Sequence, residues 1–442
     1  MKKGRRLRRT KLVYRIHESK HRIRYSFAEL CRRCSDNICD NSMASLILTR
    51  RDLGAALLAG VPTFARAQSG SQLGNLYPPI QAMADASPLE LSFLRPEFHD
   101  HRQWQRLARE KVFDLLHYRP TSVPPEAQVL AKRKREGFIE EHLTFRSSPQ
   151  WRVPAHLLLP SNGQPPFPAV VVLHDHGGFY MWGREKVVST DNQHPVLTQF
   201  KQQYYSGRSI ANELVRQGYA VITIDMFYWG ERRYLLPDDP IVWRERPSYM
   251  TAQQIAEFNA RSSQNEQLIA RSLLTAGVTW PGIIVWDDLR TLEYLASRSE
   301  IDQNRLACVG LSVGGYRSFM LAALDPRIRA AVDVGWMTAF ASQIKQHVIH
   351  TMGLTFVIPG MYRYFDLPDL AAMIAPRALM VQMGSRDTLF PLPGVQAAFA
   401  KIDQCYQKVG SPDRQWCKLF DVPHEFNEKM QSQAWEWLKR WV

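Results

Sequence analysis

The chain has 442 residues, of which 45% are hydrophobic and 22% are charged, and it contains only 6 cysteines. This apolar content excludes a mostly disordered chain, and the cysteine count excludes a scaffold built on disulfides. The formal charge of +14 is concentrated at the start, where residues 1–42 carry +9 and residues 43–67 carry +2, so the remainder is nearly neutral. A protein that tracks nucleic-acid phosphates needs a basic body, and we therefore expect no nucleic-acid partner.

Residues 43–67 have the pattern of an export signal. Arg50-Arg51 precede a short apolar stretch at 55–61, and the segment ends on Ala65-Arg66-Ala67. Paired arginines, a short apolar region and a small-x-small end are typical of a twin-arginine signal peptide. We expect cleavage after Ala67, passage through the twin-arginine export machinery and a periplasmic or secreted location. The alternative is a buried helix that follows two arginines by chance.

Two further expectations follow from this signal. The apolar stretch is too short to span a bilayer and no cysteine directly follows Ala67, so no stable membrane anchor is expected. Because such a signal normally begins close to the initiator, we interpret residues 1–42 as a spurious N-terminal extension.

The next part of the chain, residues 68–136, is predicted as a lead-in segment. Residues 68–86 are rich in Gly, Ser, Pro and Ala and predict a flexible stretch, whereas residues 88–117 carry a helical apolar pattern. The strand-like runs 138–145 and 151–159 are joined by Arg-Ser-Ser-Pro-Gln and predict an antiparallel hairpin.

After Pro168, short apolar runs alternate with helical stretches. The predicted strands are Ala169–Leu173, Ala220–Ile224, Leu306–Leu311, Ala330–Val334, Ala378–Gln382 and Trp416–Phe420. The predicted helices between them include 209–217, 283–297 and 314–324. This alternation predicts an α/β fold for residues 137–442, with a mostly parallel central sheet and helices on both faces. The long polar segment 232–281 is predicted to be an inserted cap.

One predicted strand ends in a nucleophile motif. Gly310-Leu311-Ser312-Val313-Gly314-Gly315 follows the strand at 306–311 and precedes a helix, which is the context of a nucleophile elbow. A serine on such a turn is exposed at the carboxyl edge of the sheet, and Gly310 and Gly314 avoid collisions with neighbouring elements. Ser312 is therefore the predicted nucleophile.

A serine needs a base and an acid that orients the base. Asp387 follows the strand at 378–382, and His424 follows the strand at 416–420. The order Ser312, Asp387, His424 is the one expected of α/β-hydrolases. Asp421 is the alternative acid, but it ends the strand that carries the base, so we favour Asp387.

Backbone N–H groups that hold an oxyanion complete the predicted site. Val313 directly follows the serine and supplies one donor. The turn Leu173-His174-Asp175-His176-Gly177-Gly178 follows another strand and offers the second, at His176, with Gly177 as the alternative. Adjacent positions on one turn rarely converge on an ion, so we expect no metal at His174, Asp175 and His176.

These segments resemble the α/β-hydrolase superfamily and, within it, the group of dienelactone hydrolases and acetyl xylan esterases. The resemblance covers about residues 88–442 and is carried by the segments at 173–178, 286–288, 310–315, 384–387 and 423–426. It implies a serine ester hydrolase that forms an acyl-enzyme and needs no cofactor, with Ser312 as nucleophile, Asp387 as acid, His424 as base, and Val313 and His176 as oxyanion donors. Dienelactone hydrolases carry a cysteine where this chain has Ser312, which favours other esters, such as those of acetylated sugars.

The sequence therefore predicts an exported serine carboxylesterase that acts on acetyl or other short-chain esters, those of carbohydrates included. Two alternatives remain open: a serine peptidase of the prolyl-oligopeptidase type, whose elbow is similar, and a non-catalytic binding protein on the same fold. Aromatic and methionine residues near the expected strand ends are candidates for lining a pocket: Phe227, Tyr228, Trp229, Trp336, Met361, Tyr362 and Tyr364.

Overall fold

The computed structural model of the chain describes residues 70–442. The predicted export signal at 43–67, the predicted extension at 1–42, and Cys31, Cys34 and Cys39 lie outside the described residues. Cys308, Cys405 and Cys417 are free thiols, and the first two are buried.

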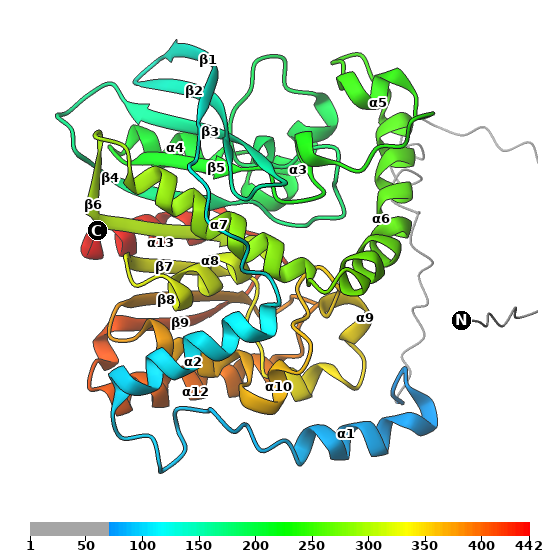
Figure 1. The fold of residues 1–442 in the computed structure, drawn as a ribbon, viewed down its shortest axis with the longest axis vertical. Helices are drawn as coiled ribbons and strands as arrows, with labels where there is room; N and C mark the ends of the chain where they lie inside the picture. The colour runs from blue at the N-terminus through cyan, green and yellow to red at the C-terminus, as the bar shows by residue number, and fades with distance from the viewer. Residues whose placement is uncertain (1–69) are drawn as a thin grey trace, which may run out of the picture. The chain divides into compact units, whose positions relative to one another are not determined.

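The described chain is built around one mixed sheet of nine strands (Figure 1). Its order is β1-β2-β3-β5-β4-β6-β7-β8-β9. The strands are β1 Gln128–Arg135, β2 Phe138–Arg146, β3 Arg152–Pro160, β4 Phe167–Leu173, β5 Ala220–Ile224, β6 Ile301–Leu311, β7 Ile328–Val334, β8 Ala378–Gly384 and β9 Gln415–Phe420. Pairing is antiparallel from β1 through β3 to β5 and parallel from β5 to β9. The predicted hairpin and the mostly parallel sheet are both confirmed.

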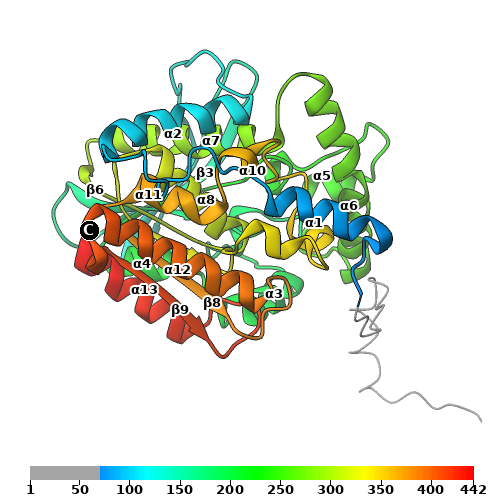
Figure 2. The same cartoon turned by 90° about the horizontal axis from the view of Figure 1, so that it is seen from below.

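Helices cover both faces of this sheet. They are α1 Tyr77–Asp85, α2 His101–Leu116, α3 Pro195–Tyr205, α4 Ile210–Arg216, α5 Ile241–Glu245, α6 Ala252–Thr275, α7 Trp280–Ala296, α8 Val313–Leu324, α9 Val348–Thr351, α10 Met361–Tyr364, α11 Ala371–Ile374, α12 Leu392–Val409 and α13 Glu428–Trp441. Figure 2 shows α3, α4 and α13 on one side of the strands and α2, α7, α8 and α11 on the other.

The two-sided burial follows from the strand sequences. Along β4, Val170 and Val172 pack with the α4 and α13 side, whereas Val171 and Leu173 pack with the α7 and α8 side. Successive side chains of a strand point to opposite faces of the sheet, so a strand with no polar residue must be covered by other elements on both faces. This is why the central strands read as continuous apolar runs in the sequence.

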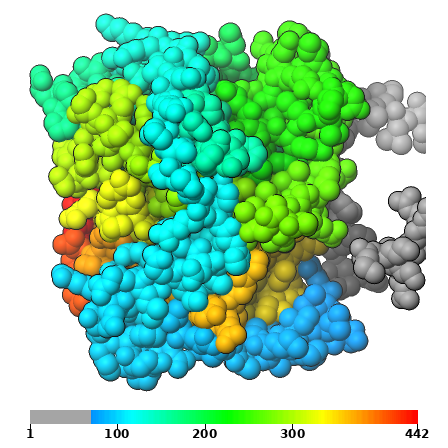
Figure 3. All heavy atoms as spheres, viewed as in Figure 1, coloured from blue at the N-terminus to red at the C-terminus, as the bar shows by residue number. Residues whose placement is uncertain are grey.

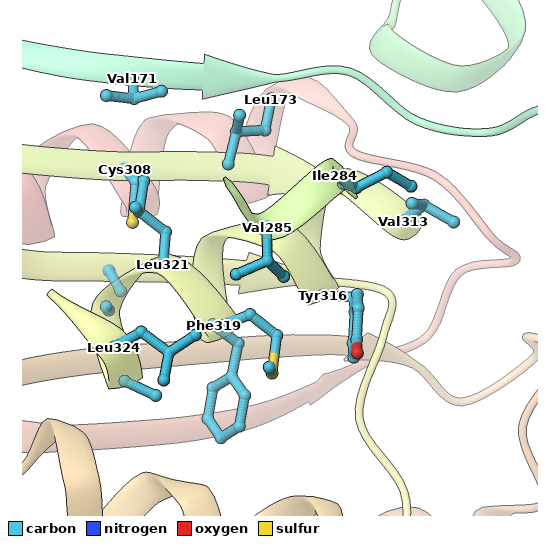
Figure 4. Packing of buried hydrophobic residues seen from close by; sticks show 14 of the residues in the cluster. Val171, Leu173, Ile284, Val285, Cys308, Val313, Tyr316, Phe319, Leu321 and Leu324 are labelled. Atoms are coloured by element: carbon cyan, nitrogen blue, oxygen red, sulfur yellow. The ribbon is translucent and has the colours of Figure 1, made fainter. Parts of the chain in front are cut away.

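The core under the nucleophile motif is formed by β4, β6, α7 and α8 (Figure 4). Cys308 on β6 faces α8, where Leu321 is fully buried, and its thiol donates to the Ser318 carbonyl oxygen at 3.2 Å. Val285 on α7 packs into the same layer. Tight packing of α8 on its two strands holds the start of that helix in a defined place.

The lead-in segment differs in detail from its prediction. The helix predicted at 88–117 begins only at His101, where Asp100 accepts a hydrogen bond from the Gln103 N–H at 2.9 Å and so caps α2. Two prolines at 88 and 96 interrupt the stretch before it, because each lacks the N–H that a helix interior needs. The stretch predicted as flexible, 68–86, contains α1.

Strand β1 was not predicted, because most of its side chains are polar and exposed. It pairs with β2 at the edge of the sheet, and Lys132 and Arg135 form ion pairs with Glu141 and Glu140 of that strand. Charged residues are typical of an edge strand, where they discourage pairing with a second chain. Figure 3 shows the chain between α2 and β1, in cyan, crossing this face of the molecule.

The segment predicted as a cap, 232–281, contains α5 and the long helix α6. Helix α6 begins with a capping box at Thr251 and Gln254. Within residues 70–442 no single helix is long and apolar enough to cross a membrane, although α6 and α7 together, bent by 83°, pass the same test of length and composition.

Candidate active site

Ser312 lies on a sharp turn between β6 and α8. Its backbone angles, φ 59° and ψ −128°, are ones that L-residues avoid, and its N–H donates to the Val334 carbonyl oxygen on β7 at 2.7 Å. A side chain at Gly314 would collide with the Leu173 carbonyl oxygen, and one at Gly310 would collide with the Gly314 backbone. Strain of this kind persists only where the surroundings enforce it, and it is common at catalytic sites. The turn therefore has the geometry predicted for a nucleophile elbow.

Asp387 and His424 meet at the same edge of the sheet, on the loops that follow β8 and β9. The His424 Nδ1 lies 2.5 Å from Asp387 Oδ2, and the Leu389 N–H donates to Asp387 Oδ1 at 2.9 Å. The Asp387 side chain is 1% exposed and that of His424 18%. Because the Asp387 carboxylate accepts a hydrogen bond from Nδ1 of His424, that nitrogen carries the proton, and Nε2 keeps a free lone pair.

Asp421, the alternative acid, does not contact the imidazole. Its side chain is 88% exposed and pairs with the Arg386 guanidinium at 2.9 Å. Of the two candidate acids, Asp387 is thus the one that contacts His424.

The imidazole packs beside the elbow. A Cβ at Gly335, the residue after Val334, would lie 3.1 Å from His424 Cε1 and 3.3 Å from a methyl group of Leu311. Ser312 and His424 line one pocket. No hydrogen bond joins the Ser312 hydroxyl to His424 within the described residues, and in ligand-free enzymes such bonds often form only when substrate binds.

The turn after β4 lines the same pocket as His424. Within residues 70–442 the backbone N–H groups of His176 and Gly177 donate to no protein acceptor. Gly177 and Gly178 have φ of 58° and 62°, which glycine adopts at little cost. The Val313 N–H opens α8 and has no acceptor within its own helix. These free donors line the pocket that also holds Ser312.

The side chain of Lys186 binds the backbone of this turn. Its ammonium group, fully buried, donates to the carbonyl oxygens of Asp175 and His176 at 2.9 Å each and lies 3.3 Å from Asp175 Oδ2. The Trp229 indole N–H also donates to the His176 carbonyl oxygen, at 3.2 Å. Burial lowers the pKa of Lys186, and the Asp175 carboxylate opposes that shift. Lys186 thus fixes the turn through the carbonyl oxygens of Asp175 and His176, and it occupies none of the backbone N–H groups.

A buried network of charged residues fixes the segment that carries Lys186. Lys186 ends a short helical turn whose Arg184 binds Asp225 through both its backbone N–H, at 2.8 Å, and its guanidinium. Gly183 and Gly230 surround Asp225 so closely that a side chain at either position would collide with it. Charges buried to this degree are tolerated only when they are paired and hydrogen-bonded.

The pocket has a volume of about 410 Å³. One side of it is aromatic and aliphatic, with Trp336, Phe356 and Leu389. The other side is polar and combines the turn after β4 with α6, from which Ser263 and Glu266 reach the pocket. Burial, followed by the nearby Glu266 carboxylate, raises the pKa of Tyr180 on this wall.

Of the seven predicted pocket residues, Trp336 alone lines this pocket. Trp336 and Phe356 also line a second, mainly apolar cavity of about 430 Å³, which Met361 and Tyr362 share. The others, Phe227, Tyr228, Trp229 and Tyr364, line neither cavity.

The residues that sequence reasoning missed are Lys186, Glu266, Ser263 and His350. None belongs to a recognisable motif, and α6 is a polar helix whose inward face cannot be identified without the fold. Within residues 70–442 no three His, Cys, Asp or Glu side chains are grouped so that they could hold a metal ion.

Comparisons with known proteins agree with this architecture. The chain is 25% identical over 334 residues to the Bacillus subtilis (strain 168) protein named "Putative hydrolase YtaP", an alignment that spans 76% of this chain and 98% of that protein. Among solved structures, the "putative acetyl xylan esterase" of Bacteroides fragilis NCTC 9343 superposes with a TM-score of 0.60 at 20% identity, over 78% of this chain and 82% of that one.

A glucuronoyl esterase from Teredinibacter turnerae T7901 superposes with a TM-score of 0.53 at 16% identity, over 81% of this chain and 90% of its own. The Abhydrolase family matches residues 79–237 and 250–417, which include every residue of the site except His424. The match begins again at residue 250, just before α6. The chain therefore belongs to the Abhydrolase family and is an α/β-hydrolase.

Proposed function

We propose that the protein is a serine carboxylic-ester hydrolase whose catalytic triad is Ser312, Asp387 and His424. The observation that carries this proposal is the 2.5 Å contact between His424 and the buried Asp387 at the edge of the sheet where the strained Ser312 enters the same pocket. A nucleophile, a base and an oriented acid on three different loops of one sheet edge are the requirements for acyl transfer.

The reaction has two halves. His424 Nε2 takes the proton of the Ser312 hydroxyl as its oxygen attacks the ester carbonyl, and the imidazolium then gives that proton to the departing alcohol. Water next attacks the acyl-enzyme with the same base and releases the carboxylic acid and free Ser312. Asp387 holds the imidazole in the tautomer that leaves Nε2 able to accept, and it stabilises the imidazolium.

The negative charge that develops on the carbonyl oxygen needs two fixed donors. We assign them to the N–H groups of Val313 and His176, which donate to no protein acceptor within residues 70–442 and belong to residues that line the pocket of Ser312. Gly177 is the alternative to His176. The positive end of the α8 dipole lies beside the same oxygen and favours its charge.

We propose acetyl or other short-chain esters as substrates, those of carbohydrates included. A pocket of about 410 Å³ with one aromatic wall and one polar wall suits a small acyl group on a hydroxylated alcohol. The names of two structural neighbours, a putative acetyl xylan esterase and a glucuronoyl esterase, support the carbohydrate part of this proposal, and the first of them also supports the acetyl group.

The experiment that tests this function compares the wild type with Ser312→Ala and with Ser432→Ala, a control at an exposed serine on α13. We expect Ser312→Ala to lose more than about 10³-fold of the turnover of 4-nitrophenyl acetate and all labelling by a fluorophosphonate probe, with an unchanged circular dichroism spectrum. Full activity in Ser312→Ala would overturn the triad. Faster cleavage of short peptide amides than of acetyl esters would identify a peptidase instead.

We also propose that the chain is exported, on the basis of the sequence pattern at 43–67. Replacing Arg50 and Arg51 with lysine should leave the protein in the cytoplasm of the expressing bacterium. Periplasmic recovery equal to that of the wild type would contradict a twin-arginine route.

A further inference from the structure

Glu266 is a carboxylate that α6 carries into the pocket that holds Ser312. Its Oε1 accepts from His176 Nε2 and from the Tyr180 hydroxyl, each at 2.8 Å. The side chain is 20% exposed, and within the described residues its Oε2 makes no hydrogen bond. Glu266 therefore has one oxygen tied to the turn after β4 and one oxygen open to the pocket.

The partners of Glu266 are uncharged. The His176 Nδ1 accepts from the Gly178 N–H at 3.0 Å, so that nitrogen carries no proton and the ring that donates to Glu266 is neutral. Tyr180 is a neutral phenol, and its pKa is raised. The negative charge of Glu266 is consequently not cancelled by the groups that bind it.

The remaining lining residues supply no fixed positive charge. No arginine or lysine lines the pocket in the described part of the chain. The other lining carboxylate, Asp175, is buried, pairs with Lys186 and accepts from the Tyr205 hydroxyl at 2.5 Å. The titratable groups left are Tyr204, His350, which is exposed on α9, and the proposed base His424. Among the described lining residues, Glu266 is therefore the carboxylate that has no lysine or arginine partner.

We infer that Glu266 selects the substrate by charge, so that the enzyme takes esters that are uncharged around the scissile bond and disfavours esters that carry a carboxylate there. This inference rests on the proposed function. The free Oε2 accepts a hydrogen bond from a hydroxyl group of a neutral alcohol, whereas it repels an anionic group placed at the same point. A carboxylate about 7 Å from Glu266 in a half-open pocket should lower kcat/KM roughly tenfold.

The test uses a matched pair of acetate esters at pH 8, 4-acetoxybenzamide and 4-acetoxybenzoate, which differ in a neutral amide and a carboxylate on the leaving alcohol. We expect the wild type to prefer the neutral ester about tenfold in kcat/KM, with a smaller ratio at high salt. Glu266→Gln keeps an oxygen that accepts from His176 and Tyr180 but removes the negative charge, so the preference for the neutral ester over the charged one should fall to about twofold or less. Glu257→Gln, at an exposed position on the same helix, should keep the wild-type preference.

Equal kcat/KM for the two esters in the wild type, or an unchanged preference in Glu266→Gln, would overturn the inference. A failure of the proposed function is a different result, namely no turnover of the neutral ester by the wild type. In that case the affinities of the same two esters for Ser312→Ala, measured by calorimetry, report the charge preference without catalysis. Equal affinities would overturn the inference about Glu266.

Discussion

Lys186 offers a sharp test of how the turn after β4, which carries the proposed oxyanion donor His176, is held in place. Lys186→Met keeps an unbranched apolar stem and removes the charge with its three contacts, two to the carbonyl oxygens of Asp175 and His176 and one to the Asp175 carboxylate. All of these groups are buried or nearly so, and the lysine itself is inaccessible to solvent. The substitution therefore leaves a buried carboxylate with the Tyr205 hydroxyl as its remaining side-chain partner.

The expected cost in stability follows from that unpaired charge. Removing one partner of a buried ion pair typically costs about 3–5 kcal/mol, and the retained hydrogen bond places the expected loss near 3 kcal/mol. Adding Asp175→Asn removes the stranded charge while its side-chain oxygen can still accept from Tyr205. The double variant should therefore recover about half of the lost free energy of unfolding, measured by urea denaturation followed by tryptophan fluorescence.

Activity should not recover with stability. In both variants the two carbonyl oxygens lose the ammonium group that binds them, and the His176 carbonyl oxygen keeps only the Trp229 indole as a side-chain donor, so the His176 N–H is held less firmly. Loss of one oxyanion donor lowers kcat by about 10²–10³-fold, and we expect a decrease of about 10² on 4-nitrophenyl acetate in both the single and the double variant. Wild-type activity in Lys186→Met, or activity that returns together with stability in the double variant, would refute this role of Lys186.

Three further predictions concern the site and the core beneath it. Asp387→Asn should lower kcat by about 10³–10⁴-fold because the imidazole loses its tautomer, whereas Asp421→Asn should stay within twofold; equal effects in steady-state assays would contradict the assignment of the acid. Gly314→Ala should destabilise the protein by more than about 3 kcal/mol in urea unfolding, because the added methyl collides with a strand carbonyl oxygen that cannot move away; a midpoint within 0.3 M of wild type would contradict it. Burial raises the pKa of Asp333 well above its usual range, the Trp336 backbone N–H opposes this shift, and no side chain within residues 70–442 pairs with the carboxyl group. Its contribution to stability is therefore fully present below about pH 4 and is lost as pH rises through the folded pKa. Between pH 5 and 9, the free energy of unfolding of the wild type should fall relative to that of Asp333→Asn, by at most about 1.4 kcal/mol per pH unit. The exposed control Asp413→Asn should follow the wild type. Parallel profiles for the wild type and Asp333→Asn would show that Asp333 is not protonated.

Local sequence was sufficient for the central strands and for the order of the three catalytic candidates. Strands such as Ala220–Ile224 are buried on both faces, so their apolar character is visible without knowledge of their neighbours. The turn at Ser312 needs glycines at fixed positions, and this requirement is also local. The contact between His424 and Asp387 was predictable because the carboxyl ends of parallel strands meet at one edge of a sheet.

Other features depend on residues that are distant in sequence, and the tertiary structure alone decides them. Strand β1 is polar and is a strand because β2 offers it hydrogen bonds and opposite charges, neither of which its own residues reveal. Lys186 and Glu266 belong to a buried turn and to a polar helix, and they become parts of the pocket when the fold brings them to His176. Periodicity in a sequence reports which face of an element is buried, whereas the polarity and charge of a pocket depend on which elements meet there.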